Sequence, residues 1–180
     1  MLKEEIPLQY NTLRAEILKR MELRQQILTV TLAGISIFSA GVTGEIILPI
    51  FLLLYPLLGL CLAIAWSHHD VRTGELGEYI LRYIEPHFTL KWEKYMREFY
   101  TGRKDIGKRL AEYASMGTFI GTEIAAIILA VSFQFLNLTS VTPPNSNLYL
   151  GFFFSLGILD IFAVVLTYRF IHARRKRYVK

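Results

Sequence analysis

Cysteine is almost missing from this chain of 180 residues: the only one, Cys61, lies within a long apolar stretch. A single cysteine excludes a disulfide framework and a cysteine-based metal cluster within one chain. A lone cysteine in such a stretch is typically a small, buried apolar side chain. Residues 1–26 also lack the short apolar segment and cleavage site of a secretory signal peptide, so we expect the first hydrophobic segment to be a retained anchor.

Charge is nearly absent from two parts of the sequence. Residues 27–66 carry one charged residue, Glu45, and are long enough for two membrane crossings of roughly 20 apolar residues each. Glycines beside Glu45 supply a tight turn between the two crossings. Residues 116–136 and 148–168 contain one carboxylate each and flank a segment rich in Asn, Ser, Thr and Pro. The pattern predicts four transmembrane helices in two hairpins.

The predicted fold is an all-α membrane protein that forms one membrane domain with cytoplasmic helical extensions. Its expected parts are a cytoplasmic helical arm (1–26), a first transmembrane hairpin (27–66), a cytoplasmic helical insert (67–115), a second transmembrane hairpin (116–168) and a basic cytoplasmic tail (169–180).

The positive charges all lie on one side of this predicted topology. Five Lys and Arg residues fall in 1–26, nine in 67–115 and six in 169–180, which together are all 20 in the chain. The two short loops on the other side have none. The positive-inside rule therefore places both termini in the cytoplasm of a multi-pass protein in the cell membrane, with the lipid bilayer as its first partner.

Two long helices are expected to extend from the first hairpin into water. No glycine or proline separates residues 8–26 from the first crossing, and the second crossing continues in helical pattern until Pro86 ends it. We also expect a kink at Pro56. Antiparallel helices that turn near residues 43–45 pair residues whose numbers sum to about 89, which sets two arms, 8–26 and 67–85, side by side. The expected salt bridges between the arms are Arg20 with Asp70, Glu16 with Arg72, and Arg14 with Glu75.

An amphipathic helix is predicted between the arms and the third crossing. Trp92, Tyr95, Met96 and Phe99 fall on one helical face, and charged residues of both signs occupy the rest. Such a helix lies in the headgroup layer or packs on the arms, and the mixed charge favours the arms.

Glu123 and Asp160 are the strongest candidates for function. Carboxylates inside membrane crossings are costly and are often functional. Both lie roughly 10–14 Å from the cytoplasmic end of their crossings at 1.5 Å of rise per residue, so they can share a proton, bind a cation or line a polar path. A structural role is the alternative, in which a protonated carboxyl bonds a hydroxyl of Thr118, Thr122 or Ser155, or Asp160 pairs with Arg169.

Small residues mark two helix-contact stripes. Ser36, Ala40 and Gly44 recur at intervals of four, as do Gly117, Gly121 and Ala125. Such stripes let helix backbones approach closely, within the chain or between the subunits of a homo-oligomer.

No metal, cofactor or catalytic centre is predicted. The adjacent His68 and His69 point about 100° apart on a helix and do not suit one ion. No nucleophile lies in a pattern that pairs it with a base, so we do not expect an enzyme. The basic tail suits anionic lipid headgroups, and we do not expect nucleic acid as a partner. The tail residues concerned are Arg174, Arg175, Lys176 and Arg177.

The first half of the chain resembles a known family. The residues that carry the likeness are Tyr10, Thr12, Leu13, Arg14, Glu16, Ile17 and Arg20, then Arg24, Gln25, Gln26 and Ile27, then Trp66, Asp70, Arg72, Gly77, Tyr79 and Ile80. This pattern resembles a family of small, uncharacterised bacterial four-helix integral membrane proteins, over residues up to about 85. The resemblance implies a prokaryotic cytoplasmic membrane, and because the family has no established activity it implies no site residues.

Three functional hypotheses follow from the sequence. The first is a self-associating, non-enzymatic membrane module whose arms couple a cytoplasmic partner or signal to a pore or membrane perturbation, as in a stress or phage-defence effector. The second is a small proton-coupled transporter subunit that uses Glu123 and Asp160. The third is a membrane scaffold or assembly factor without permeation.

Overall fold

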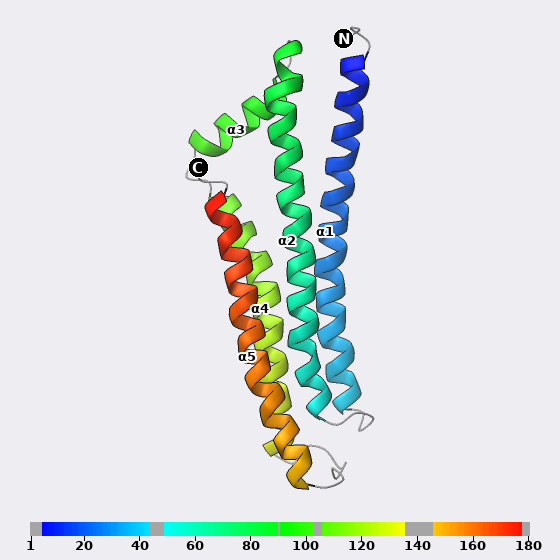
Figure 1. The fold of residues 1–180 in the computed structure, drawn as a ribbon, viewed down its shortest axis with the longest axis vertical. Coiled ribbons are helices and arrows are strands. Elements are labelled where there is room, and N and C mark those ends of the chain that lie inside the picture. Colours follow the sequence, from blue (N-terminus) through cyan, green and yellow to red (C-terminus); the bar gives the residue numbers. More distant parts are fainter. Residues whose placement is uncertain (1–4, 44–48, 90, 103–105, 136–145, 178–180) are drawn as a thin grey trace.

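The computed structural model describes residues 5–43, 49–89, 91–102, 106–135 and 146–177, and every element within these ranges is helical. Four long helices form an elongated bundle, and a short fifth helix projects from it (Figure 1). The α-helices are α1 (Glu5–Thr43), α2 (Tyr55–Tyr79), α3 (Trp92–Gly102), α4 (Ile106–Phe135) and α5 (Ser146–Arg177).

The two arms extend beyond the part of the bundle that contains α4 and α5 (Figure 1). As predicted, α1 is unbroken from the charged arm into the apolar half. The side-chain amide of Gln9 donates to the hydroxyl of Tyr79 at 3.2 Å, and Ile17, Ile80 and Ile84 form an apolar cluster between the arms. These contacts confirm the antiparallel register expected from the turn position, because 9 and 79 sum to 88.

The start of α2 differs from the prediction for Pro56. A 3-10 helix, η1 (Pro49–Leu54), precedes α2, and Pro56 occupies the first turn of α2. Proline is tolerated there because the first-turn N–H groups have no intrahelical partner. The expected kink inside a helix is therefore replaced by a change from 3-10 to α geometry.

Beyond Tyr79, where α2 ends, the arm continues as helix to Glu85, as predicted, but its hydrogen-bonding pattern changes. A π-helical segment, η2 (Ile80–Ile84), and a 3-10 turn, η3 (Glu85–His87), complete the arm. Pro86 lies in that final turn, after which the backbone becomes extended at Phe88.

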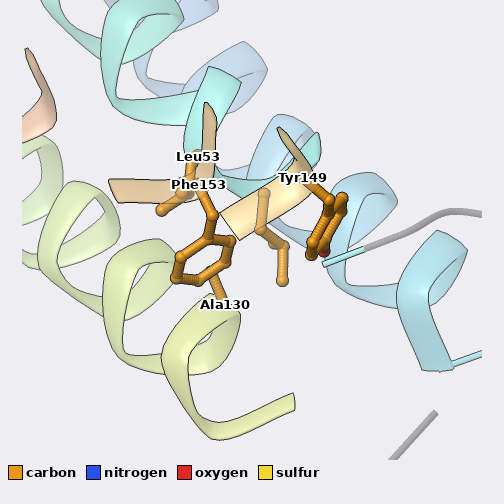
Figure 2. Close-up of a cluster of buried hydrophobic side chains, with 5 residues drawn as sticks. Leu53, Ala130, Tyr149 and Phe153 are labelled. Atoms are coloured by element: carbon orange, nitrogen blue, oxygen red, sulfur yellow. The ribbon is translucent and has the colours of Figure 1, made fainter. Parts of the chain in front are cut away.

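Apolar side chains pack in separate clusters along the bundle. At the end of the bundle opposite the arms, called the loop end here, Leu52 and Leu53 of η1 meet Ala130 of α4 and Tyr149 and Phe153 of α5 (Figure 2). Nearer the arms, Ala63 and Trp66 of α2 meet Phe119 of α4 and Ile171 of α5. These clusters leave a layer between them, and the candidate site lies in that layer.

The outer surface of the bundle is apolar. Large hydrophobic side chains such as Ile37, Ile128 and Phe162 are more than half exposed. Helices that are apolar on their outer faces as well as their inner faces are typical of membrane spans. Cys61 of α2 is exposed and belongs to this outer surface, which corrects the expectation of a buried cysteine.

Three stretches are long and apolar enough to cross a membrane: Pro49–His87, Tyr113–Phe135 and Asn147–His172. The apolar half of α1 is not among these three. Its described side chains end at residue 41, so its described apolar stretch is shorter than the other three. An all-α protein with three candidate spans is compatible with a membrane protein.

Candidate functional site

The structure buries both predicted carboxylates inside the bundle: Glu123 of α4 and Asp160 of α5 are both 0% exposed. Together with Thr167 of α5 they form the polar centre described here. Thr167 of α5 donates a hydrogen bond of 2.8 Å from its hydroxyl to Oε1 of Glu123. Asp160 and Thr167 are seven residues apart, so they share one face of α5 and both point into the bundle.

Most oxygens of this centre lack a donor. Within the described residues, no hydrogen-bond partner lies near Oε2 of Glu123 or near either carboxyl oxygen of Asp160. A buried acceptor without a donor costs about 1–3 kcal/mol, and more when it carries charge. A bound proton or a bound cation satisfies such oxygens, so the centre has the chemistry of a site that takes up one or the other.

The alternative hydroxyl partners considered from the sequence bond elsewhere. Thr118 and Thr122 donate to carbonyl oxygens one turn back on α4, at 2.9 and 2.7 Å. The hydroxyl of Ser155 is exposed and donates to its own helix at 2.9 Å. Arg169 lies on the exposed side of α5, whereas Asp160 is buried.

A glycine on α2 makes room for Glu123. A Cβ atom built on Gly59 would lie 2.9 Å from both Cγ and Oε1 of Glu123, closer than such atoms ever approach. One turn earlier, the buried hydroxyl of Tyr55 donates to the carbonyl oxygen of Thr31 on α1 at 2.7 Å. All four long helices therefore contribute to the centre. The sequence analysis did not identify Gly59, Tyr55, Thr31 or Thr167. Of these four, only Thr167 could have been found from the sequence, because it is seven residues from Asp160.

Apolar clusters lie on both sides of Glu123 along α4. Phe119 is four residues before Glu123 on α4 and packs edge-on against Trp66, with ring centroids 5.9 Å apart. Ala130 is seven residues after Glu123 and belongs to the loop-end cluster with Leu53 and Phe153 (Figure 2). At 1.5 Å per residue these layers lie roughly 6 Å and 10 Å from the carboxylate along α4.

The salt bridges of the arms differ from the predicted pairs. The salt bridge to Asp70 comes from Arg24, at 2.6 Å, one turn along α1 from the predicted Arg20. Residues three or four apart on one helix are nearer to each other than residues on neighbouring helices, so most arm charges pair within their own helix. Among the residues of the predicted pairs, Arg20 bonds Glu16, Arg72 bonds Glu75, and Arg14 bonds Glu93 of α3.

The short helix α3 is held on the arms by its polar side. The buried carboxylate of Glu85 accepts hydrogen bonds from the backbone N–H groups of Glu93 and, at 3.1 Å, Lys94, which caps the start of α3. The predicted aromatic face points outward instead, with Trp92 48% and Tyr95 59% exposed. The side chain of Phe99 lies outside the described residues.

Burial raises the pKa of Glu93, and this is the largest effect on it. The nearby Glu85 also raises the pKa, whereas Arg14, at 2.8 Å, lowers it. The net shift is upward, so Glu93 holds its proton more tightly in the folded protein than in the unfolded chain.

The small-residue stripes face outward. Gly117 and Gly121 are exposed on α4, and a Cβ atom at either would have no neighbour within 4 Å. Ser36 and Ala40 are also exposed, and Ala125 is half-buried. Gly44 lies outside the described residues, as do the side chains of Arg174, Arg175, Lys176 and Arg177.

A groove of about 590 Å³ lies between the arms. Its polar lining includes Arg20, His68, Arg72 and Glu75. The groove is on the arm side of Trp66 and so lies on the opposite side of that residue from Glu123.

Comparison of the chain with protein-family models, with curated proteins and with solved structures found no match.

Proposed function

We propose that this protein is a non-enzymatic, proton-coupled membrane transport subunit with four transmembrane helices. The observation that supports it best is the buried pair Glu123 and Asp160, which has three carboxyl oxygens without hydrogen-bond donors among the described residues. Two unpaired negative charges in a low-dielectric bundle are unfavourable, so protons bind and leave as the centre changes its access to water.

The fourth span in this proposal is the apolar half of α1. Gly34 of α1 packs against the ring of Tyr55, where an added Cβ atom would lie 3.1 Å from Cε2. α1 also contacts α4. Because this half of α1 lies alongside candidate spans, it occupies the same depth in the membrane. The one-sided Lys and Arg distribution then supports cytoplasmic termini, in a prokaryotic cytoplasmic membrane.

Burial favours a carrier over an open pore lined by these carboxylates. Glu123 and Asp160 have no exposed surface, and apolar layers lie on either side of them. A site that is closed to both faces binds its proton first and releases it after a rearrangement, which is the sequence of events in alternating access.

A self-associating effector is the second candidate, because one observation favours it. The exposed glycines of α4 present an open surface that a second copy can approach closely. In this version several copies form a pore or perturb the membrane, and the arms receive the cytoplasmic signal.

Proton flux into liposomes tests the proposal. The full-length protein is reconstituted with a pH-sensitive dye inside, and a potassium gradient with valinomycin sets an interior-negative potential. We expect proton uptake with the wild type, and a fall to the protein-free rate in Asp160→Asn and Glu123→Gln. Glu22→Gln is the matched control, since Glu22 is an exposed carboxylate paired with Lys19 on α1. Absence of wild-type flux, or full flux in Asp160→Asn, contradicts the proposal.

A further inference from the structure

The layer between the carboxylate pair and the arms is built on Trp66. Its ring is 2% exposed and meets Phe119 at an interplanar angle of 62°. Ala63 and Ile171 complete the layer. Ala63 lies one helical turn from Gly59, the residue that contacts Glu123, so the Trp66 layer is the next layer on the arm side of the centre.

The side chain of Arg24, on the arm formed by α1, contacts the ring of Trp66. The guanidinium carbon of Arg24 lies 4.7 Å from the centroid of the Trp66 ring, within the range of a cation–π contact. The same guanidinium lies 2.6 Å from a carboxylate oxygen of Asp70, which is one turn beyond Trp66 on α2. Arg24 belongs to α1, whereas Trp66 and Asp70 belong to α2. A sliding of one arm along the other therefore breaks both contacts together.

The two sides of the centre differ in polarity. On the arm side, beyond Trp66, the hydroxyl of Ser67 and Nδ1 of His69 are buried without a hydrogen-bond partner among the described residues. Ser115 of α4 is also buried. On the loop side, the corresponding layer contains Leu52 and Leu53 with Ala130 and Phe153, and its one hydroxyl, on Tyr149, is already bonded to Oε1 of Gln134 at 2.9 Å. Polar groups that can carry a proton or hold water therefore approach the centre from the arm side.

From these contacts we propose that Trp66 and Phe119 form a gate between the carboxylate pair and the cytoplasmic arms, locked by the contact of Arg24 with Trp66 and Asp70. The inference rests on the proposed function for what passes the gate. When the lock opens, the rings separate and the centre meets water on the arm side through Ser67 and His69. The loop-end layer stays closed in that state, so the centre faces the cytoplasm alone.

The gate gives the arms a means of control. The groove that holds Arg20 and His68 lies next to the lock, on the same two helices. A partner that binds there and shifts one arm relative to the other changes the separation of Arg24 from Asp70. Binding of the partner is therefore transmitted to the carboxylates through the ion pair of Arg24 with Asp70 and the ring of Trp66.

Thiol accessibility tests the gate without any measurement of transport. Cys61→Ser removes the native thiol, and Ala126→Cys places a new one in a buried position one turn past Glu123 on the loop side of the gate. A small, charged methanethiosulfonate reagent is added to inside-out vesicles, which expose the arms. We expect slow labelling in this background. In Arg24→Gln and Asp70→Asn we expect labelling to be at least ~10-fold faster. This is the increase expected when an open state that holds a few per cent of the molecules becomes the major state.

Matched variants separate the gate from general loosening. Arg24→Lys keeps the charge over the ring and is expected to label as slowly as the background. Glu22→Gln breaks an exposed pair on the same helix and is expected to have no effect. In right-side-out vesicles, Asp70→Asn is expected to label slowly as well, because the loop-end layer stays closed.

Either of two results overturns the gate: unchanged labelling in both Arg24→Gln and Asp70→Asn, or equal acceleration in Glu22→Gln. These results are independent of proton flux. If the gate opens but the protein carries no proton flux, the proposed function is refuted and the gate stands. If the protein carries proton flux but the labelling shows no gate, the gate is refuted and the proposed function stands.

Discussion

The hydroxyl of Thr167 donates to Oε1 of Glu123 at 2.8 Å, and this hydrogen bond joins α5 to α4 at the centre of the bundle. Both side chains are 0% exposed. A donor from one helix to a carboxylate on another fixes the rotation of both helices, since each side chain must point at the other. The remaining oxygens of the pair are left for a proton or cation.

Loss of that hydrogen bond is expected to weaken the bundle. Thr167→Val keeps the shape of the side chain but leaves another buried carboxyl oxygen without a donor, at a cost of about 1–3 kcal/mol. Thermal unfolding in detergent, followed by circular dichroism, measures the change. Thr118→Val is the control, because that hydroxyl bonds only its own helix at 2.9 Å and its loss is expected to matter little. Equal destabilisation by the two changes contradicts the assigned role of Thr167.

Gly59→Ala is expected to displace Glu123. The added Cβ atom would lie 2.9 Å from Oε1, so the carboxylate must move or α2 must shift away from α4. Such overpacking typically costs about 1–3 kcal/mol. We expect proton flux in liposomes to fall with it. Gly121→Ala adds the same methyl group in open space and is expected to keep the wild-type flux and stability.

Attachment of α3 to the arms is expected to weaken as pH rises. The pKa of Glu93 is raised in the folded protein, mainly by burial, so the folded state holds the proton more tightly than the unfolded state. Its contribution is fully present below the unfolded pKa and is lost as pH rises through the higher folded pKa. Hydrogen exchange of the amides in Trp92–Gly102 is therefore expected to be slower at pH 5 than at pH 8, after correction for intrinsic rates. Glu93→Gln, which cannot titrate, is expected to remove this difference in exchange rate between the two pH values. If the difference survives in Glu93→Gln, another titrating group causes it.

Reporter fusions are expected to place both termini on the same side of the membrane. A fluorescent protein that folds only in the cytoplasm is expected to be bright when fused to residue 1 or residue 180. Alkaline phosphatase, which is active only outside, is expected to be active when inserted near residue 45 or residue 140. If α1 does not cross, three spans remain and the fusion to residue 1 lies outside and is dark. The N-terminal fusion therefore decides between three and four spans.

Much of the fold was predictable because it depends on local pattern. Residues 27–66 exceed one crossing, and no proline interrupts residues 8–42, so α1 is continuous and the arms pair near the expected register. Specific salt bridges were not predictable in the same way. Asp70 pairs with Arg24 rather than Arg20 because side-chain reach and the competition from partners on the same helix decide among several nearby charges.

The sequence by itself determined that the chain is helical, that its apolar stretches suit a membrane, and that Glu123 and Asp160 are its two carboxylates within apolar helices. Only the tertiary structure decided that both carboxylates are fully buried, that Gly59 and Thr167 contact Glu123, and that Arg24 rests on Trp66. The physical reason is that hydropathy and helical period are properties of neighbours in sequence. The rotation of each helix about its axis is set by packing between residues that are far apart in the chain.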